Sequence, residues 1–544
     1  MSTTRSDHQS SLASMNRRPF ILLVLFLLSS TSSALAQNGI QFRNWKPALN
    51  DGAAVKPKLA EAGCGALVSL TGYEFSIETA TPVPASGDLP EYCHITGQIL
   101  PEVRFELSLP ASWNNRFYMF GNGGYAGEPL SAPGRINARN AALRHGFAVA
   151  QTNTGHESAN EPLGTFAVNR QKLLDYAFRA VHVTAETSKR IIREYYGNAP
   201  ARSYFDGCST GGRQGLISAQ RFPNDFDGIV VGAPVLDFTG TMTNYVSVVR
   251  ALEAAPVPIE KLKIVAERVY AKCDGADGLV DGLIDDPRRC AFDPAKELPI
   301  CANDGANDAS GKDCFTAAQI RTLNAIYRGA EAGGKRIFWG QPVGAEIGAP
   351  TQSIWANWII SPTGRTISYN FAETFFRYLA FPKPDPSYDF KTLNLETDLP
   401  RLQPISDILD AKNSDLARFK SRGGKIVMYY GWADTALNPL MGVDYYEKVS
   451  ARFGTSITDF FRLFMVPGMA HCRGGVGTDQ CDFLTALVEW VEKGVAPKQI
   501  VASQSRDGKV VRTRPLCPYP QVAKYNGTGN PDDSQSFVCA NPEK

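Results

Sequence analysis

The chain has 544 residues, a formal net charge of +2 and a hydrophobic fraction of 43%. This hydrophobic content excludes a largely disordered chain, and the near-zero charge argues against a nucleic-acid binder with a basic surface. The length allows two to four domains, or one large domain with insertions. Eleven cysteines are too few for a small disulfide scaffold but are notable in a large enzyme.

Residues 1–36 have the pattern of a secretory signal peptide. Arg17 and Arg18 precede the apolar run 20–28, and residues 34–36 (Ala-Leu-Ala) form a small-x-small cleavage site. The run is too short to cross a bilayer, which takes about 20 apolar residues, and no later segment is apolar enough. We expect a secreted or periplasmic protein with no membrane anchor in its mature form.

The first half of the mature chain alternates short apolar strands with amphipathic helices. In chain order, the pattern predicts strands at 104–110, 116–120 and 146–152, a long helix at 169–196, a strand at 203–206, a helix at 212–222 and a strand at 228–234. Strands and helices that alternate with short links are typical of a parallel sheet covered by helices.

The alternation stops at about residue 235. Residues 236–415 are predicted to be rich in loops, with cysteines, acidic turns and many aromatic residues. Regular patterning resumes with strands at 425–430 and 460–466 and a helix at 481–493. The sequence therefore indicates an α/β core built from residues 37–235 and 416–544, interrupted by one large insertion at residues 236–415.

Residues 207–211 (Gly-Cys-Ser-Thr-Gly) match the G-x-S-x-G motif and lie between a predicted strand and a predicted helix. In α/β-hydrolases this strained turn exposes the serine at the edge of the sheet, and the helix N-terminus directs N–H groups at a developing oxyanion. Ser209 is therefore the candidate nucleophile, and the N–H of Thr210 a candidate oxyanion donor. The alternative is a Gly-rich turn in an α/β protein of other chemistry.

Chain order indicates the base and the acid. α/β-Hydrolases carry Ser, acid and His in that order, and only one of the six histidines, His471, follows Ser209. It lies in a loop directly after a predicted strand. For the acid, Asp434 at a strand end is favoured over Asp444 and Asp459. A turn or helix-cap role is the alternative for Asp434.

A second oxyanion donor is expected in the loop after an early strand. Residues 121–124 (Gly-Asn-Gly-Gly) follow the predicted strand 116–120 and suit this role. An ordinary Gly-rich turn is the alternative for this loop.

Cysteines flank the candidate nucleophile and base. Cys208 directly precedes the serine and Cys472 directly follows the histidine, so the two are close enough for a bridge if the serine and histidine are within hydrogen-bond reach. The constellation Cys208-Ser209, Asp434 and His471-Cys472 resembles the tannase and feruloyl esterase family over nearly all of the mature chain. The resemblance implies an α/β-hydrolase fold with a large inserted lid, and a disulfide beside the catalytic serine and histidine.

The family pattern, together with nearness in the chain, assigns ten of the eleven cysteines to disulfides. The expected pairs are Cys208–Cys472, Cys273–Cys290, Cys64–Cys93, Cys301–Cys314 and Cys517–Cys539. Cys481 is left over on a predicted helix, where we expect a buried, inert thiol.

The loop between Cys273 and Cys290 is acidic and rich in glycine. Carboxylates at Asp274, Asp277 and Asp281 can wrap a hard cation such as Ca²⁺, which takes six to eight oxygen ligands. A solvated cluster of Asp/Gly turns is the alternative. The resemblance implies a structural calcium site made of these three side chains and the carbonyls of Leu279 and Leu283. We expect Ca²⁺ and no organic cofactor.

Substrate contacts are less constrained by the sequence. The aromatic residues of the lid form its own core, or some of them sandwich a planar acyl ring. The resemblance implies Gly124 as the second oxyanion donor and Trp358, Phe371 and Leu437 as substrate contacts. Arg365 is a candidate cation for the free carboxylate of a terephthalate monoester.

The resemblance implies a serine carboxylic-ester hydrolase that cleaves feruloyl, hydroxycinnamoyl or galloyl esters through an acyl-enzyme. Its substrate would be a small aromatic ester, or an ester derived from plant cell wall or tannin, and no nucleic-acid partner is expected. A terephthalate monoester hydrolase of the same family is the alternative. A secreted serine peptidase and a non-catalytic binding protein of the same fold are less favoured.

Overall fold

The computed structural model describes residues 41–49, 54–58, 63–302, 313–346, 354–362 and 364–542. The predicted signal peptide lies outside these residues. Within the described ranges, no helix has the length and hydrophobicity needed to cross a membrane.

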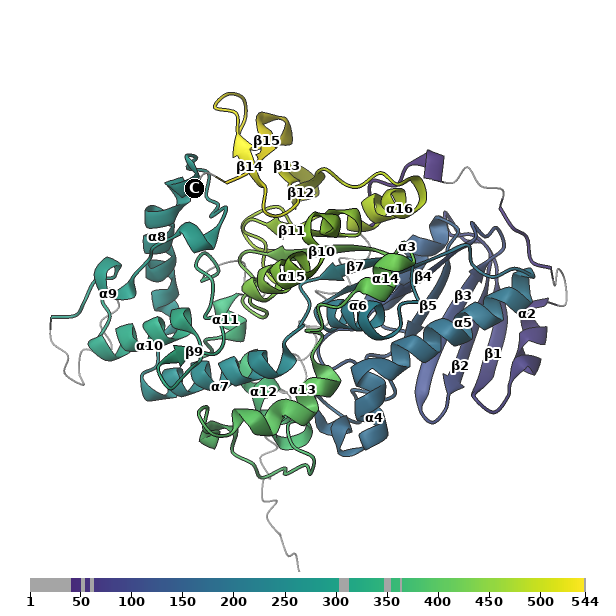
Figure 1. Cartoon of the computed structure of the whole chain (residues 1–544), viewed down its shortest axis with the longest axis horizontal. Helices are drawn as coiled ribbons and strands as arrows, with labels where there is room; N and C mark the ends of the chain where they lie inside the picture. The colour runs from purple at the N-terminus through teal and green to yellow at the C-terminus, as the bar shows by residue number, and fades with distance from the viewer. Residues whose placement is uncertain are drawn as a thin grey trace, which may run out of the picture.

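A nine-stranded sheet forms the centre of the molecule (Figure 1). In spatial order its strands are β1 (Phe75–Val83), β2 (Tyr92–Ile99), β3 (Val103–Pro110), β5 (Ala148–Thr152), β4 (Arg116–Phe120), β6 (Arg202–Cys208), β7 (Gly228–Gly232), β10 (Lys425–Gly431) and β11 (Phe461–Val466). The pairs β1–β2, β2–β3 and β3–β5 are antiparallel, whereas neighbours from β5 to β11 are parallel. This mixed sheet agrees with the expected α/β-hydrolase fold.

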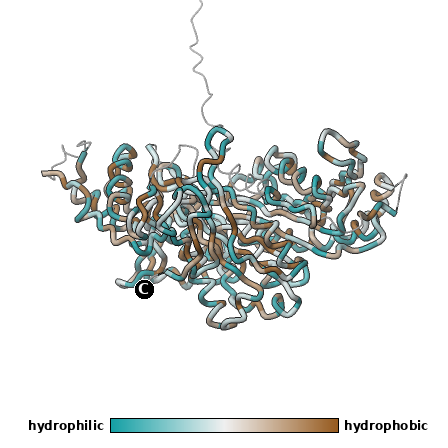
Figure 2. The backbone as a smooth tube through the Cα atoms, turned by 90° about the horizontal axis from the view of Figure 1, so that it is seen from above, coloured by the Kyte–Doolittle hydropathy of each residue, from teal (hydrophilic) through white to brown (hydrophobic). Residues whose placement is uncertain are grey.

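Helices pack against the sheet and bury its apolar strands. They are α3 (Pro133–Arg144), α5 (Ala180–Tyr196), α6 (Thr210–Arg221), α14 (Ala417–Ser421), α15 (Leu440–Phe453) and α16 (Phe483–Lys493). Strands β6 and β7 are buried almost throughout, as expected of parallel strands covered on both faces. Figure 2 shows that hydrophobic segments run through the middle of the molecule.

The segment between β7 and β10 is more helical than the sequence pattern predicts. Its helices are α7 (Phe238–Ala254), α8 (Leu262–Cys273), α9 (Pro294–Glu297), α10 (Ala317–Arg328), α11 (Trp355–Trp358), α12 (Ile367–Thr374) and α13 (Gln403–Leu409). The insertion therefore contains helices that the sequence pattern does not predict. Thr, Val and Gly in α7 lower its intrinsic helix propensity, but burial of residues such as Met242 and Tyr245 compensates for it. In Figure 1 α8, α9 and α10 lie at the end of the molecule opposite β1, and α12 and α13 lie at its lower middle.

The long helix predicted at residues 169–196 is interrupted by a π-helical turn. It consists of α4 (Arg170–Leu174), the π-turn Asp175–Arg179 and α5, which ends at Gly197 with φ 81°. Glycine is suited to this left-handed helix cap. A π-turn often occurs at a functional site, because the wider turn redirects its side chains.

The remaining elements are small and peripheral. They are α2 (Gly63–Ala66), β8 (Glu331–Ala332), β9 (Lys335–Arg336) and the C-terminal hairpins β12 (Ile500–Arg506) with β13 (Lys509–Leu516) and β14 (Val522–Tyr525) with β15 (Phe537–Ala540). The C-terminal hairpins project from the sheet next to β11 (Figure 1).

The topology brings four loops to one edge of the sheet. Strands β4, β6, β10 and β11 run parallel, so their carboxyl ends meet at the same edge. The loops that follow them contain residues 121–124, Ser209, Asp434 and His471, respectively. This is the edge at which α/β sheets place their sites.

Candidate active site

Ser209 occupies a strained turn between the end of β6 and the start of α6. Its φ of 63° and ψ of −121° lie in a region that residues with a Cβ rarely adopt. The turn is tight enough to require its glycines, since a Cβ on Gly207 would lie 2.5 Å from the carbonyl carbon of Gly211. The backbone thus has the geometry of a nucleophile elbow.

His471 and Asp434 form a buried pair. His471 Nδ1 lies 2.8 Å from Asp434 Oδ2, and the side chain of Asp434 is fully buried. The backbone N–H of Leu437 donates to Asp434 Oδ1 at 2.8 Å. The carboxylate therefore holds Nδ1 as the protonated nitrogen and leaves Nε2 to act as a base. The alternative acids lie elsewhere: Asp444 pairs with Lys448 on α15, and Asp459 is exposed.

Cys208 and Cys472 form a disulfide between the serine turn and the histidine loop. Their Cα atoms are 6.0 Å apart although 264 residues separate them in the chain. The other disulfides are the expected pairs Cys64–Cys93, Cys273–Cys290, Cys301–Cys314 and Cys517–Cys539. Cys481 is free and buried, and burial raises the pKa of its thiol well above the usual range, so it is not a reactive thiolate.

Three of the four backbone N–H groups in the loop 121–124 have a hydrogen-bond acceptor among the described residues, and that of Gly124 has none. Gly121 N–H donates to Asp206 O at 2.9 Å, Asn122 N–H to Gln214 Oε1 at 3.1 Å, and Gly123 N–H to Glu128 Oε1 at 2.8 Å. In the described part of the chain, the N–H groups of Gly124 and Thr210 have no hydrogen-bonded acceptor. These two groups are the ones expected to hold an oxyanion.

Hydroxyl groups fix Gly124 to the start of α6. The hydroxyl of Thr210 donates to the Gly124 carbonyl at 2.5 Å, and the hydroxyl of Tyr176 donates to the same oxygen at 3.1 Å. Tyr176 lies in the π-turn Asp175–Arg179. The two candidate oxyanion donors are thereby tied together.

Trp358 and Phe371 of the insertion lie against this machinery. The ring of Trp358 is 6.0 Å from the His471 ring in an edge-to-face arrangement, and 5.8 Å from the Phe371 ring. A Cβ on Gly124 would lie 3.4 Å from Phe371 Cζ, and Phe371 stacks on Tyr125 at 4.8 Å. Aromatic side chains therefore lie beside both His471 and the loop 121–124.

The other two expected substrate contacts have partners of their own. Leu437 is buried, and its backbone supports Asp434. Arg365 forms an ion pair with Glu373 at 3.1 Å, and its guanidinium lies 4.7 Å from the ring centroid of Tyr369. Their roles in substrate binding stay predictions.

The acidic loop 273–290 folds around its own carboxylates. Asp274 accepts from Gly282 N–H at 3.1 Å, Asp277 from Leu279 N–H at 3.0 Å, and Asp281 from Leu283 N–H at 3.2 Å. Burial, followed by the charge of nearby Asp281, raises the pKa of Asp277.

This crowding of like-charged oxygen donors fits a hard cation. Within the described residues, however, no three acidic, His or Cys side chains converge closely enough to hold an ion, and Asp281 also pairs with Arg514. The calcium site stays a prediction.

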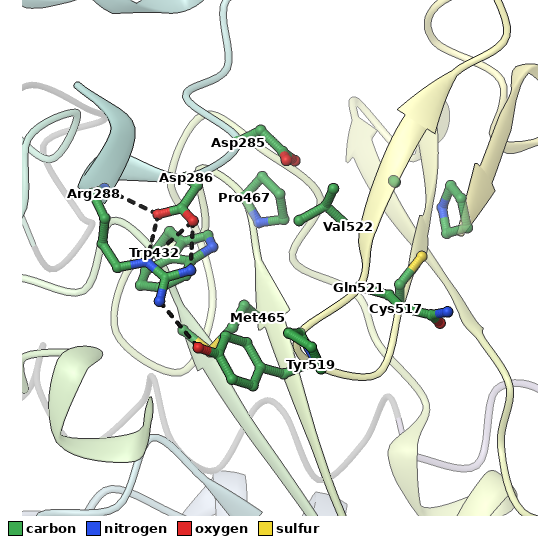
Figure 3. Close-up of a pocket in the computed structure, with 13 residues that line it drawn as sticks. Asp285, Asp286, Arg288, Trp432, Met465, Pro467, Cys517, Tyr519, Gln521 and Val522 are labelled. Carbon is green, nitrogen blue, oxygen red and sulfur yellow. Dashed lines mark hydrogen bonds and ion pairs between the residues drawn. The ribbon is translucent and has the colours of Figure 1, made fainter. Parts of the chain in front are cut away.

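A pocket lies beside the acid and histidine loops (Figure 3). Trp432 of the acid loop and Pro467 of the histidine loop line it. The Arg288 guanidinium lies 5.0 Å from the ring centroid of Trp432, pairs with Asp286 at 2.6 Å and donates to the hydroxyl of Tyr519 at 3.2 Å. The inserted segment and the C-terminal segment therefore both support the acid loop.

Sequence reasoning missed three residues that shape the oxyanion loop: Glu128, Tyr176 and Gln214. Glu128 lies four residues after Gly124, but no motif marks it, and the other two lie on helices far from the loop in the chain. Only the packing of these segments reveals their contacts.

Comparison with known proteins places this geometry in context. The family model "Tannase and feruloyl esterase" matches residues 88–540. Mono(2-hydroxyethyl) terephthalate hydrolase of Piscinibacter sakaiensis is 33% identical, with 85% of this chain and 87% of that protein covered. A probable feruloyl esterase B-1 of Aspergillus terreus is 30% identical, with 80% and 83% covered. The crystal structure of feruloyl esterase B from Aspergillus oryzae aligns with a TM-score of 0.77 and 26% identity, covering 88% of this chain and all of that one.

Proposed function

The chain belongs to the tannase and feruloyl esterase family and is a carboxylic ester hydrolase, and we propose that it releases an aromatic acid from its ester through an acyl-enzyme on Ser209. The observation that carries the assignment of residues is the buried His471–Asp434 pair, joined by a disulfide to the serine turn. No other histidine follows the serine in the chain.

In the proposed reaction, His471 Nε2 takes the proton of Ser209 as its Oγ attacks the ester carbonyl. Asp434 holds the imidazole and stabilises its positive charge. The N–H groups of Thr210 and Gly124 bind the oxyanion, and collapse of the tetrahedral intermediate expels the alcohol, which takes its proton from His471. Water, activated by the same histidine, then attacks the acyl-enzyme and releases the acid.

We propose that the acyl ring packs against Trp358 and Phe371, whose own ring centroids are 5.8 Å apart. Both rings lie close to the catalytic groups, and a planar hydroxycinnamoyl or galloyl ring is suited to an aromatic slot. A terephthalate monoester is the second candidate, because a relative that hydrolyses one is 33% identical. The pairing of Arg365 with Glu373 favours an acyl ring without a free carboxylate.

We also propose that the mature protein is exported and that Ca²⁺ stabilises the acidic loop. Residues 17–36 have the signal-peptide pattern, and five disulfides are typical of proteins that fold in an oxidising compartment. For Ca²⁺, the support is the spacing of Asp274, Asp277 and Asp281 along one glycine-rich loop that a disulfide closes.

The test of the proposed function is a substrate panel. Purified mature protein should hydrolyse methyl ferulate or methyl gallate with a higher kcat/KM than a terephthalate monoester, and should not cleave the matching aryl amides. Ser209→Ala should abolish hydrolysis and labelling by a fluorophosphonate. A variant that keeps its activity would overturn the assignment of Ser209, and a preference for terephthalate monoesters would favour the second candidate.

Trp358→Ala tests the slot, with an acetate ester as the internal control. Its kcat/KM for an aromatic acyl ester should fall about 10-fold or more, while that for the acetate ester changes little, because only the aromatic acyl group stacks on the ring. An equal fall for both esters would assign Trp358 to the support of His471 instead.

A further inference from the structure

We propose that Glu128 is a positioning residue that selects which backbone N–H of the loop 121–124 faces the substrate. The inference rests on the proposed function, since it gives Glu128 a role only if Gly124 N–H binds an oxyanion. Glu128 is 4% exposed and lies outside the catalytic triad, and its carboxylate contacts the loop directly.

Both oxygens of this carboxylate accept hydrogen bonds from the loop 121–124. Oε1 accepts from the N–H of Gly123 at 2.8 Å, and Oε2 accepts from the side-chain amide of Asn122 at 3.0 Å. The same amide donates to Thr152 O at 2.9 Å, and Gln214 binds the other polar groups of Asn122. The loop is therefore clamped to β5 and to α6 around Glu128.

The clamp determines the direction of consecutive peptide groups. Gly123 N–H is drawn away from the substrate toward Glu128, while the Gly124 carbonyl is held by Thr210 and Tyr176. With the groups on both sides fixed, Gly124 N–H is left to face the reaction centre. Gly124 adopts φ +52°, so without the clamp this glycine can reach other conformations at low cost.

Arg135 provides the counter-charge that keeps a carboxylate in this buried position. Its guanidinium is fully buried, lies 3.7 Å from Glu128 Oε2, and donates to Gln151 and to the carbonyl of Thr152. A buried carboxylate needs such a partner as well as hydrogen bonds. The buried carboxylate of Glu128 therefore has both an opposite charge, from Arg135, and hydrogen-bond donors, from the loop.

Glu128→Gln tests the proposal with almost no change in shape. A glutamine has one acceptor oxygen, so either Gly123 N–H or the Asn122 amide would meet the glutamine NH₂, donor against donor. We expect kcat for an aromatic ester to fall about 10- to 100-fold while KM changes little, because a misplaced donor weakens transition-state binding. The affinity of a boronic acid, whose serine adduct places an oxygen in the oxyanion hole, should fall in parallel.

Glu106→Gln is the matched control. Glu106 is a comparably buried carboxylate on β3 that pairs with Arg139 at 2.9 Å, and within the described residues it forms no hydrogen bond with the loop 121–124. Its variant should lose stability without losing kcat or boronate affinity. In Glu128→Gln the acidic limb of the pH–rate profile should stay in place, because His471 and Asp434 are untouched.

The outcomes separate this inference from the proposed function. If the wild type hydrolyses aromatic esters and Glu128→Gln matches Glu106→Gln in kcat and boronate affinity, the role of Glu128 is overturned and the esterase assignment stands. If the wild type hydrolyses no ester, the proposed function fails first. Should Glu128→Gln not fold, Glu128→Asp against Glu106→Asp decides by the same measurements, because Asp retains the charge but shortens the reach to Gly123.

Discussion

A disulfide joins Cys208, the residue before Ser209, to Cys472, the residue after His471, with a Cα–Cα distance of 6.0 Å. A covalent link in this position constrains the distance between Ser209 and His471, which come from distant parts of the chain. It also restricts the unfolded chain, because it closes a loop across 264 residues.

We predict that Cys208→Ala/Cys472→Ala reduces both stability and specific activity. The chain-entropy estimate for so long a loop is about 5.6 kcal/mol of unfolding free energy. Activity per folded molecule should fall as well, because Ser209 and His471 lose their link. Denaturant unfolding and initial rates at a temperature where the variant is folded give the two quantities.

Cys64→Ala/Cys93→Ala is the control for this experiment. That disulfide spans 29 residues and attaches to β2, several strands away from the site. The control should lose about 3–4 kcal/mol of stability and keep its specific activity. Equal specific activities in the two double variants would contradict a catalytic role for the Cys208–Cys472 link.

Asp434→Asn should lower kcat by about 10³- to 10⁴-fold, since an amide no longer selects the Nδ1–H tautomer of His471 or stabilises the imidazolium. KM and the unfolding temperature should change far less. Asp444→Asn is the control: its ion pair with Lys448 lies on α15 and is partly exposed, so its loss should be nearly neutral. A large loss of activity in the control would reopen the choice of acid.

Buried Asp206 and Asp482 should each contribute less stability as the pH rises from about 4 to 7. Burial, with the charge of Asp482 adding to it, raises the pKa of Asp206 to about 7, and burial raises that of Asp482 to about 7. In the unfolded chain both titrate near pH 4. Unfolding between these values therefore releases protons, which costs up to about 1.4 kcal/mol of stability per pH unit and group.

Asp206→Asn checks this dependence by thermal unfolding between pH 5 and pH 8. The variant should show a shallower decline than the wild type and should gain most at pH 8, where the buried carboxylate of the wild type is charged. Asp88→Asn, at an exposed position, should follow the wild-type curve. Parallel curves for all three proteins would show that Asp206 does not titrate in this window.

Chelation of Ca²⁺ should lower the unfolding temperature by several degrees before it affects activity at low temperature, because the acidic loop lies in the insertion and contributes no catalytic group. Added Ca²⁺ should restore the unfolding temperature. Asp274→Asn/Asp277→Asn should unfold at a lower temperature and be insensitive to the chelator. Loss of activity at an unchanged unfolding temperature would contradict a structural role.

Most core elements can be predicted from the sequence because they are buried on both faces. Strands β4, β6, β7 and β10 agree with the predicted ranges to within a few residues. Strands β1 and β2 and the C-terminal hairpins were not predicted. The edge strand β1 and the peripheral hairpins bury only part of one face, so their apolar alternation is weak, and β1 also contains Pro82.

The sequence by itself determined the residue types that can carry the chemistry. Ser209 lies in a G-x-S-x-G motif, and His471 is the only histidine that follows it, so the sequence is sufficient to propose both residues. Asp434 could only be favoured over Asp444 and Asp459 until its 2.8 Å contact with His471 separated them.

Tertiary structure alone decided which groups are free to act. The sequence shows a Gly-rich loop, but the acceptors that engage Gly121, Asn122 and Gly123 come from β6, α6 and Glu128. Whether an N–H group faces a substrate depends on which of its neighbours is already bound, and those partners meet only when distant segments pack at one edge of the sheet. That packing leaves Gly124 and Thr210 side by side, linked through a single hydroxyl.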